Sequence, residues 1–264
     1  MRLGWLTDIH LNFVPPHGRE NFYRSLPPDL DALLIGGDIG EADSVVPLLH
    51  EMQRARKLPI YFVLGNHDFY RGSIAVVRDA ATRLTAESST LHWLPARGVV
   101  PLTSSTALVG HDSWADGRFG HFFRSDVLLN DYFLIAELRT PTRNERFARM
   151  NALGDEAAGY LECRVTEALA VARHVVVLTH APPFREACWH QGRLSDDDWL
   201  PHFACKAVGE RLRAHMACHP DHRMTVLCGH THSPGVAHIL DNLEVRTGQA
   251  EYGRPRLQQV LQVE

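Results

Sequence analysis

Residues 60–68 read Ile-Tyr-Phe-Val-Leu-Gly-Asn-His-Asp, an apolar run that ends in a glycine and three polar side chains. A short run rich in branched apolar residues is typical of a strand buried on both faces. Five further runs share this design: Leu3–Thr7, Ala32–Ile35, Ala107–Val109, Val175–Leu178 and Thr225–Leu227. A histidine, an aspartate or an asparagine follows each run within a few residues. The pattern therefore predicts six strands whose carboxyl ends carry chemically active side chains.

Segments with helical spacing separate these strands: residues 43–56, 73–85, 151–173 and 206–215. In the third segment, apolar residues recur three to four positions apart, as on one face of an amphipathic helix. Strand–helix alternation implies right-handed β-α-β units and a mostly parallel sheet. Near the end of the chain the pattern predicts a hairpin around Asp241-Asn242, between Gly235–Leu240 and Glu244–Thr247, and a last strand over Leu257–Val263.

The composition is that of a globular protein. The chain has 264 residues, a formal net charge of −4, and 45% hydrophobic and 22% charged residues, which argues against disordered and collagen-like classes. The slightly acidic balance argues against a dedicated nucleic-acid binder or a binder of anionic membranes, because both usually carry a basic excess. No internal repeat or linker is visible, so the sequence predicts one domain over residues 1–264.

The beginning of the chain predicts a cytoplasmic protein. Its apolar start is short and leads directly into Asp8 and His10, unlike a cleavable signal peptide. The sequence contains no run of about 18 apolar residues, so we expect no transmembrane helix. The five cysteines form no C-x-x-C pair, and we expect them to be free thiols in a reducing compartment.

Oxygen and nitrogen donors gather at the ends of the predicted strands, among them several of the 17 histidines. The set is Asp8, His10, Asp38, Asn66, His67, His180, His230 and His232. In open α/β sheets, ligands bind beyond the carboxyl ends of the strands, so these side chains are expected to converge. A set without sulfur suits Zn, Mn, Fe or similar divalent ions, and it is too large for one closed site but natural for two ions.

The order of these motifs resembles the signature of the calcineurin-like metallophosphoesterase superfamily. The motifs are Asp8-x-His10, Gly37-Asp38, Gly65-Asn66-His67-Asp68, His180 and Gly229-His230-Thr231-His232. Five motifs in the family's order, each after a predicted strand, are far more specific than any one of them. The resemblance implies an α/β fold, namely a four-layer α/β/β/α sandwich in which two mixed sheets flanked by helices pack face to face.

The resemblance also implies a dinuclear metal centre, and a ligand set of nitrogen and oxygen atoms admits Mn, Fe, Zn, Ni or Co as its ions. One ion would be held by Asp8, His10 and His232, the other by Asn66, His180 and His230, and Asp38 would bridge both. A hydroxide between the ions would attack phosphorus in line, because metal binding lowers the pKa of water. His67 would protonate the leaving oxygen or help to stabilise the transition state.

Departures from the family's patterns indicate which branch of the superfamily this chain resembles. In the protein Ser/Thr phosphatases an aspartate lies three places after the bridging aspartate and is followed by a phosphate-holding arginine, whereas this chain has Glu41 and Ala42. That branch also reads Gly-Asn-His-Glu where this chain has Asp68. Glu41 is a candidate to orient His67. The pattern is closer to the bacterial cyclic-nucleotide phosphodiesterases and small phosphoesterases, which favours a small-molecule or nucleotide substrate, either a phosphomonoester or a phosphodiester.

Four residues near the motifs are candidate substrate contacts: Asn12, Arg71, His111 and Trp114. Insertions at about residues 111–150 and 181–205 are expected to shape the substrate pocket as loops on a rigid scaffold. Two alternatives stay open. One is a catalytically inactive interaction module of the same fold, and the other is a nuclease, which would usually carry a basic groove.

Overall fold

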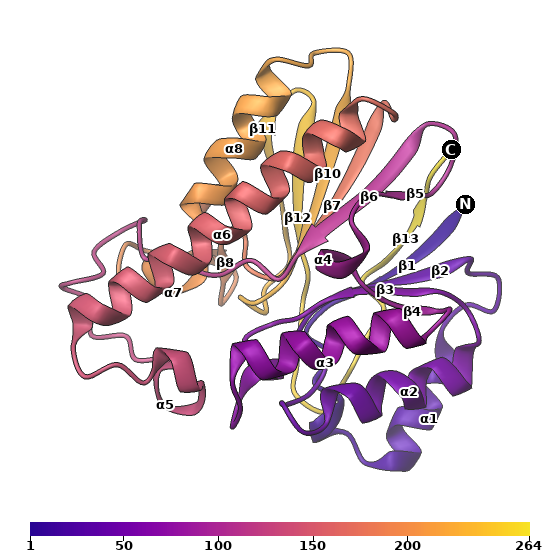
Figure 1. Cartoon of the computed structure of the whole chain (residues 1–264), viewed down its shortest axis with the longest axis horizontal. Helices are drawn as coiled ribbons and strands as arrows, with labels where there is room; N and C mark the ends of the chain where they lie inside the picture. The colour runs from indigo at the N-terminus through magenta and orange to yellow at the C-terminus, as the bar shows by residue number, and fades with distance from the viewer.

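The computed structural model describes all 264 residues and places two sheets face to face (Figure 1). The first sheet has the strand order β13-β1-β2-β3-β4. Its strands are β1 (Arg2–Leu6), β2 (Ala32–Gly36), β3 (Ile60–Val63), β4 (Leu91–Trp93) and β13 (Gln259–Gln262). Strands β1 to β4 run parallel and β13 runs antiparallel to β1, so the first and last strands of the chain are neighbours.

The second sheet has the order β11-β12-β10-β7-β6-β5. Its strands are β5 (Val100–Pro101), β6 (Thr106–His111), β7 (His174–Thr179), β10 (Arg223–Cys228), β11 (Gly235–Leu240) and β12 (Leu243–Thr247). The four inner strands are parallel, and the edge strands β5 and β11 are antiparallel to their neighbours. Both sheets are therefore mixed, and the predicted hairpin between β11 and β12 is confirmed.

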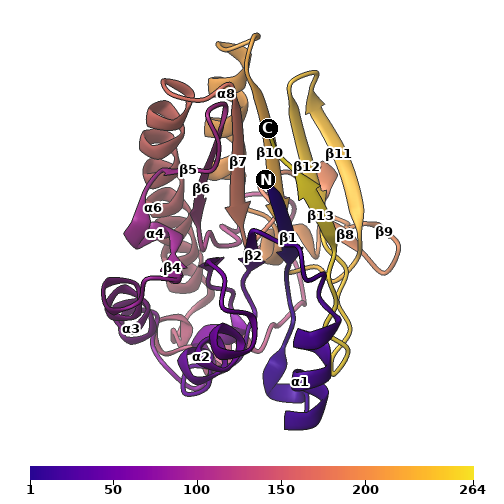
Figure 2. The ribbon, with the colours of Figure 1, turned by 90° about the vertical axis from the view of Figure 1, so that its right-hand side faces the viewer.

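Helices cover the outer face of each sheet. The first sheet carries α1 (Pro16–Ser25), α2 (Val45–Arg56) and α3 (Ile74–Glu87), and the second carries α6 (Arg143–Leu169) and α8 (Lys206–Ala217). Figure 2 shows α6 and α8 against the second sheet and α1, α2 and α3 at the opposite end of the view. No helix combines the length and the apolar composition that crossing a membrane requires.

Successive side chains of strand β2 alternate between two layers of the hydrophobic core. Leu33 and Ile35 belong to the core under α2 and α3, whereas Leu34 belongs to the layer between the two sheets. Val176 of β7 meets Leu34 in that inner layer. Complete burial of a side chain of this kind stabilises a fold by about 1.5–3 kcal/mol, so both faces of the strand contribute. The predicted four-layer sandwich is confirmed.

Short elements lie mainly between β6 and β10, in the two segments that we interpreted as insertions. They are α5 (Asp131–Leu134), η3 (Ala136–Leu138), η4 (Arg185–Ala187), β8 (Trp189–His190), β9 (Arg193–Leu194) and α7 (Leu200–Phe203). Three others lie earlier in the chain: η1 (Leu11–Phe13), η2 (His67–Phe69) and α4 (Leu94–Arg97).

Helix α6 begins eight residues before the predicted start at residue 151 and ends before residue 173. The start is set by Thr142, whose side-chain oxygen accepts a hydrogen bond from the backbone N–H of Glu145. Such a cap satisfies a donor that has no partner within the helix. The irregular part of the first insertion therefore ends at Thr142 rather than near residue 150.

Candidate metal centre

The predicted donors lie in loops that leave the carboxyl ends of parallel strands. Five of them adopt left-handed backbone conformations: Asp8, His10, Asp38, His230 and His232, with φ of 50°, 41°, 54°, 70° and 59°. Non-glycine residues rarely adopt such angles, and those that do cluster at functional sites where the surrounding structure holds them. The concentration of strained backbone at these donors marks the edge of the sandwich as the site.

Glycines let these loops approach one another. A Cβ atom on Gly229 would lie 1.9 Å from Oδ2 of Asp8, and one on Gly65 would lie 2.1 Å from Oδ1 of Asp38. Both distances are shorter than any real contact of a side-chain carbon, so each position requires glycine. The loop after β10 thus lies against the loop after β1, and the loop after β3 against the loop after β2.

A first donor set joins Asp8, His10, Asp38 and His232, whose ligating atoms all lie within 4.8 Å of one another. Nε2 of His10 lies 3.2 Å from Nε2 of His232 and 3.7 Å from Oδ2 of Asp38. Nε2 of His232 lies 3.5 Å from Oδ1 of Asp8. Two imidazoles and two carboxylates in this arrangement can hold one divalent cation.

A second donor set lies on the other side of Asp38. Oδ1 of Asn66 lies 2.9 Å from Nε2 of His180 and 2.9 Å from Nδ1 of His230, and these two nitrogens are 3.2 Å apart. Oδ1 of Asp38 lies 3.4 Å from Nε2 of His180. Because its Oδ2 faces His10, Asp38 presents one carboxylate oxygen to each donor set.

Backbone carbonyls determine which ring nitrogen of each histidine faces this second set. Nδ1 of His180 donates to the carbonyl of Gly36 at 2.8 Å, and Nε2 of His230 donates to the carbonyl of His202 at 3.1 Å. A carbonyl oxygen can only accept, so these nitrogens carry the protons and the opposite nitrogens carry lone pairs. With Oδ1 of Asn66, three acceptors face each other without a hydrogen to share. A bound cation removes that repulsion, so the donor set fits a metal ion.

The amide of Asn66 is held in the matching orientation. Its Nδ2 donates to Oδ1 of Asp131 at 2.9 Å and to the hydroxyl of Tyr70 at 3.2 Å, and Tyr70 itself donates to the same Asp131 oxygen at 2.7 Å. These contacts direct the oxygen of Asn66 toward the histidines. Outer contacts of this kind orient ligands and tune metal affinity.

Burial governs the ionisation of the donors. Burial lowers the pKa of His10 well below its usual range and lowers the pKa of His230 to about 3, so both rings are in the neutral form that binds metals. Burial, together with the charges of Asp8 and Asp68, raises the pKa of Asp38 well above its usual range. A divalent cation on either side is the interaction that would keep this carboxylate ionised.

His67 lies at the rim of the donor sets. Its backbone N–H donates to Oδ1 of Asp38 at 2.9 Å, and its ring packs on that of Tyr70 with centroids 4.2 Å apart. Burial lowers the pKa of His67 to about 3. Nε2 of His67 lies 3.5 Å from the hydroxyl oxygen of Tyr252.

Glu41 does not orient His67, in contrast to our expectation. The Glu41 carboxylate pairs with the guanidinium of Arg71 instead. Asp68 has a structural role, because its carboxylate accepts hydrogen bonds from the backbone N–H groups of Ile39, Gly40 and Gly65.

The four candidate substrate contacts lie outside the cavity beside the donor sets. Arg71 is 70% exposed and directed to Glu41, and Asn12 lies in η1. His111 is 3% exposed and accepts a hydrogen bond from the backbone N–H of Ser113. Trp114 is buried against Phe69, with ring centroids 5.8 Å apart. His111 and Trp114 follow a strand as the donors do, but their side chains pack into the core and do not line the cavity.

The cavity beside the donor sets has a volume of about 220 Å³. Besides Asp38, Asn66, His67, His230 and His232, it is lined by Tyr70, Leu129, Asn130, Asp131, His190, Trp199, Phe203, Thr231 and Tyr252. Six of the nine lining residues that were not predicted as site residues come from the two predicted insertions. The sequence did not single out the residues from the insertions, because none of them belongs to a motif or directly follows a main strand.

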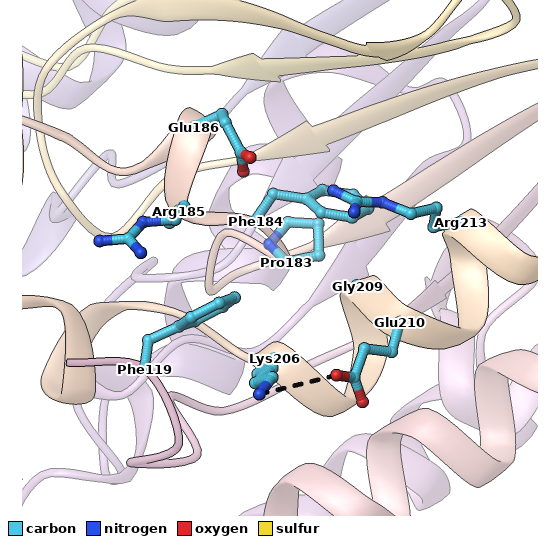
Figure 3. Close-up of a pocket in the computed structure, with 9 residues that line it drawn as sticks. All are labelled: Phe119, Pro183, Phe184, Arg185, Glu186, Lys206, Gly209, Glu210 and Arg213. Atoms are coloured by element: carbon cyan, nitrogen blue, oxygen red, sulfur yellow. Dashed lines mark ion pairs between the residues drawn. The ribbon is translucent and has the colours of Figure 1, made fainter.

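A separate hollow of about 200 Å³ opens between α8 and the segment before η4 (Figure 3). Arg213 lies over the ring of Phe184, with its guanidinium carbon 5.5 Å from the ring centroid, and Lys206 lies 3.7 Å from the carboxylate of Glu210. The third cation of the hollow, Arg185, pairs with Asp197 at 2.9 Å, so all three already have partners. None of the donor residues lines this hollow.

Similarities to known proteins agree with this geometry. The sequence pattern described as calcineurin-like phosphoesterase matches residues 1–234. UDP-2,3-diacylglucosamine hydrolase of Shewanella pealeana is 24% identical over 240 residues, which cover 80% of this chain and 95% of that protein. The protein of the same name from Escherichia coli O1:K1 / APEC is 32% identical over 171 residues, covering 58% of this chain and 66% of its own length.

Two solved structures share the fold. Phosphopantetheinyl hydrolase from Mycobacterium tuberculosis superimposes with a TM-score of 0.69 at 17% identity, covering 95% of this chain and 89% of its own. A dimetal phosphatase from Danio rerio superimposes with a TM-score of 0.59 at 13% identity, covering 97% and 89%. With the sequence pattern matched over most of its length, the chain belongs to the calcineurin-like phosphoesterase family.

Proposed function

We propose that the protein is a dinuclear metal-dependent phosphoesterase that hydrolyses a small-molecule or nucleotide phosphomonoester or phosphodiester. The observation that carries this proposal is the position of Asp38, which presents one oxygen to each of two donor sets. A site for a single structural ion would be closed by four ligands and would not need a carboxylate shared with a second set. The family to which the chain belongs supports the same reading.

Seven residues would hold the two ions. Asp8, His10, Asp38 and His232 would hold one ion, and Asp38, Asn66, His180 and His230 the other. When bound, a pair of Mn, Fe, Zn, Ni or Co ions supplies Lewis acidity that activates water near neutral pH and stabilises charge on a phosphoryl group. The protein positions the ester, excludes bulk water from the buried donors and provides a proton donor.

His67 is the proposed proton donor to the leaving oxygen. It lines the cavity next to Asp38, and its side chain belongs to neither donor set. Burial lowers the pKa of His67, so its ring is neutral in the free protein. A bound phosphoryl group would place negative charge beside the ring and favour its protonated form, as a general acid requires.

The cavity is sized for a small ester rather than a long polymer. Two similar proteins carry names of hydrolases that act on small phosphate-containing molecules, UDP-2,3-diacylglucosamine hydrolase and phosphopantetheinyl hydrolase. We also propose that the protein acts in the cytoplasm, where its five unpaired cysteines would stay reduced.

The test combines metal analysis with turnover. The purified protein is depleted of metal, reconstituted with Mn²⁺, and assayed with p-nitrophenyl phosphate and bis(p-nitrophenyl) phosphate. We expect about two ions per chain and hydrolysis of at least one ester, both lost in Asp38→Ala. Asp79→Ala is the control, because Asp79 pairs with Arg83 on the exposed face of α3. Two bound ions without turnover of any ester would favour the inactive interaction module, and a wild-type rate in Asp38→Ala would overturn the metal assignment.

A further inference from the structure

Three aromatic side chains form one wall of the cavity beside the donor sets: His190, Trp199 and Phe203. Trp199 and Phe203 stack with centroids 5.2 Å apart and an angle of 23° between their rings, and His190 lies 5.0 Å from Trp199 and 5.1 Å from Phe203. All three come from the segment between His180 and α8, which is the second predicted insertion.

This wall is anchored next to the second donor set. The ring of Phe203 meets that of His230 edge to face, with centroids 5.4 Å apart. Trp199 is half-buried and continues the wall away from the donors. A phosphoryl group at the donor sets would therefore place the organic part of the ester alongside these rings.

Thr231 contacts the wall through its backbone. Thr231 is 1% exposed and belongs to the lining of the cavity. Its backbone carbonyl is already engaged, because Nδ1 of His190 lies 3.3 Å from it. This contact ties the His190 ring to the loop that carries His230 and His232.

We propose that His190, Trp199 and Phe203 form a subsite for a planar aromatic ring carried by the phosphoester. The proposal rests on the proposed phosphoesterase function. A planar ring gains from stacking on aromatic side chains whatever its substituents, which makes such a wall selective for ring-bearing esters over aliphatic ones.

The test compares matched esters in Trp199→Ala. Phenyl phosphate is paired with glycerol 2-phosphate, and adenosine 3′,5′-cyclic phosphate is paired with glycerophosphoethanolamine. We expect KM for the ring-bearing members to rise about tenfold, as for the loss of one stacking partner, while KM for the aliphatic members changes less than about twofold. Trp199→Tyr keeps a stacking face and is expected to retain most of the preference.

A purely structural role of Trp199 would change both members of each pair alike, and that result would overturn the proposal. So would an unchanged KM for every ring-bearing ester. Metal content is measured in parallel and is expected to stay at the wild-type value, because Trp199 contacts none of the donors. If the wild-type protein hydrolyses aliphatic esters but prefers them to ring-bearing ones, the subsite fails and the phosphoesterase function stands. If it hydrolyses no ester, the function itself fails.

Discussion

Nδ1 of His180 donates a hydrogen bond of 2.8 Å to the carbonyl oxygen of Gly36, although the two residues are 144 positions apart and lie at the ends of strands in different sheets. The bond links the end of β7 to the end of β2 within the candidate metal centre. It also directs the lone pair of Nε2 toward Asn66. The second donor set therefore depends on how the two sheets pack, and not only on the residues that form it.

This relationship predicts a stepwise loss of metal. His180→Ala removes one donor from the second set and leaves Asp8, His10 and His232 in place. We expect about one ion per chain instead of two, and a fall in turnover of at least about a thousandfold, because a two-ion clamp on the phosphoryl group is lost. Elemental analysis of the purified variant measures the first quantity.

His50→Ala is the matched control, since His50 lies on α2 and its ring contacts only Gln53 among polar groups. It should bind two ions and turn over substrate at the wild-type rate. If His180→Ala also retains two ions, its ring is not a ligand.

A second prediction concerns Asp131, which touches no proposed metal ligand except the amide of Asn66. Asp131→Ala frees that amide to rotate. We expect the affinity of the second donor set to fall about 10- to 100-fold, as is usual for outer partners of ligands. Tyr70→Phe removes a weaker contact at 3.2 Å and is expected to have a smaller effect in the same direction.

Metal affinity in these variants is measured by competition with a chelator of known strength. Asp126→Ala is the control, because Asp126 is an exposed residue of the same segment. Equal affinities in Asp131→Ala and Asp126→Ala would show that Asn66 is held in place without Asp131.

The strands and the residues at their ends could be predicted from sequence because both signals are local. A run such as residues 60–64 is apolar and branched, and the polar residues directly after it can only lie at the carboxyl end of that strand. Parallel topology brings such ends together within each sheet, and the packing of the two sheets then places Asn66 of the first against His180 of the second. The start of α6 was missed although Thr142 and Glu145 carry a local capping signal.

The remaining parts of the site depend on tertiary contacts that no local sequence pattern predicts. Tyr252 reaches His67 from the segment before β13, which contains no motif. Asp131 lies in a four-residue helix and would read as a solvated loop residue, yet it is buried beneath Asn66. His111 and Trp114 mislead in the opposite way, since they follow a strand but pack into the core. Only the tertiary arrangement separates these cases.

A third prediction concerns the leaving group. His67→Ala removes the proposed proton donor but no metal ligand, so two ions should remain bound. Hydrolysis of p-nitrophenyl esters should fall only modestly, because that leaving group departs without a proton, whereas hydrolysis of alkyl esters should fall about 100- to 10,000-fold. Tyr252→Phe, which removes the hydroxyl 3.5 Å from Nε2 of His67, is expected to shift the same ratio to a smaller extent. Wild-type rates of His67→Ala on an alkyl ester would refute the assignment of His67 as the acid.

The last prediction concerns pH and the core residue His111. Burial lowers its pKa to about 4, so its ring is neutral in the folded protein over most of the acidic range. The unfolded chain binds a proton at this residue below its ordinary pKa of about 6.5. Between these two values the unfolded state holds more protons, so the free energy of unfolding must fall as the pH falls, and this contribution levels off below about pH 4. Above about pH 6.5 the contribution is present in full.

His111→Asn keeps an acceptor for the Ser113 N–H but cannot titrate. At neutral pH the variant should be less stable than the wild type, because Asn fills less of the space against Tyr160. As the pH falls from about 6.5 to about 4, the gap in unfolding free energy should shift by up to about 3 kcal/mol in favour of the variant. Urea unfolding of both proteins at several pH values measures that gap, and the metal-site histidines cancel in the difference because both proteins carry them. A gap that stays constant with pH would show that His111 is protonated to the same extent in the folded and unfolded states.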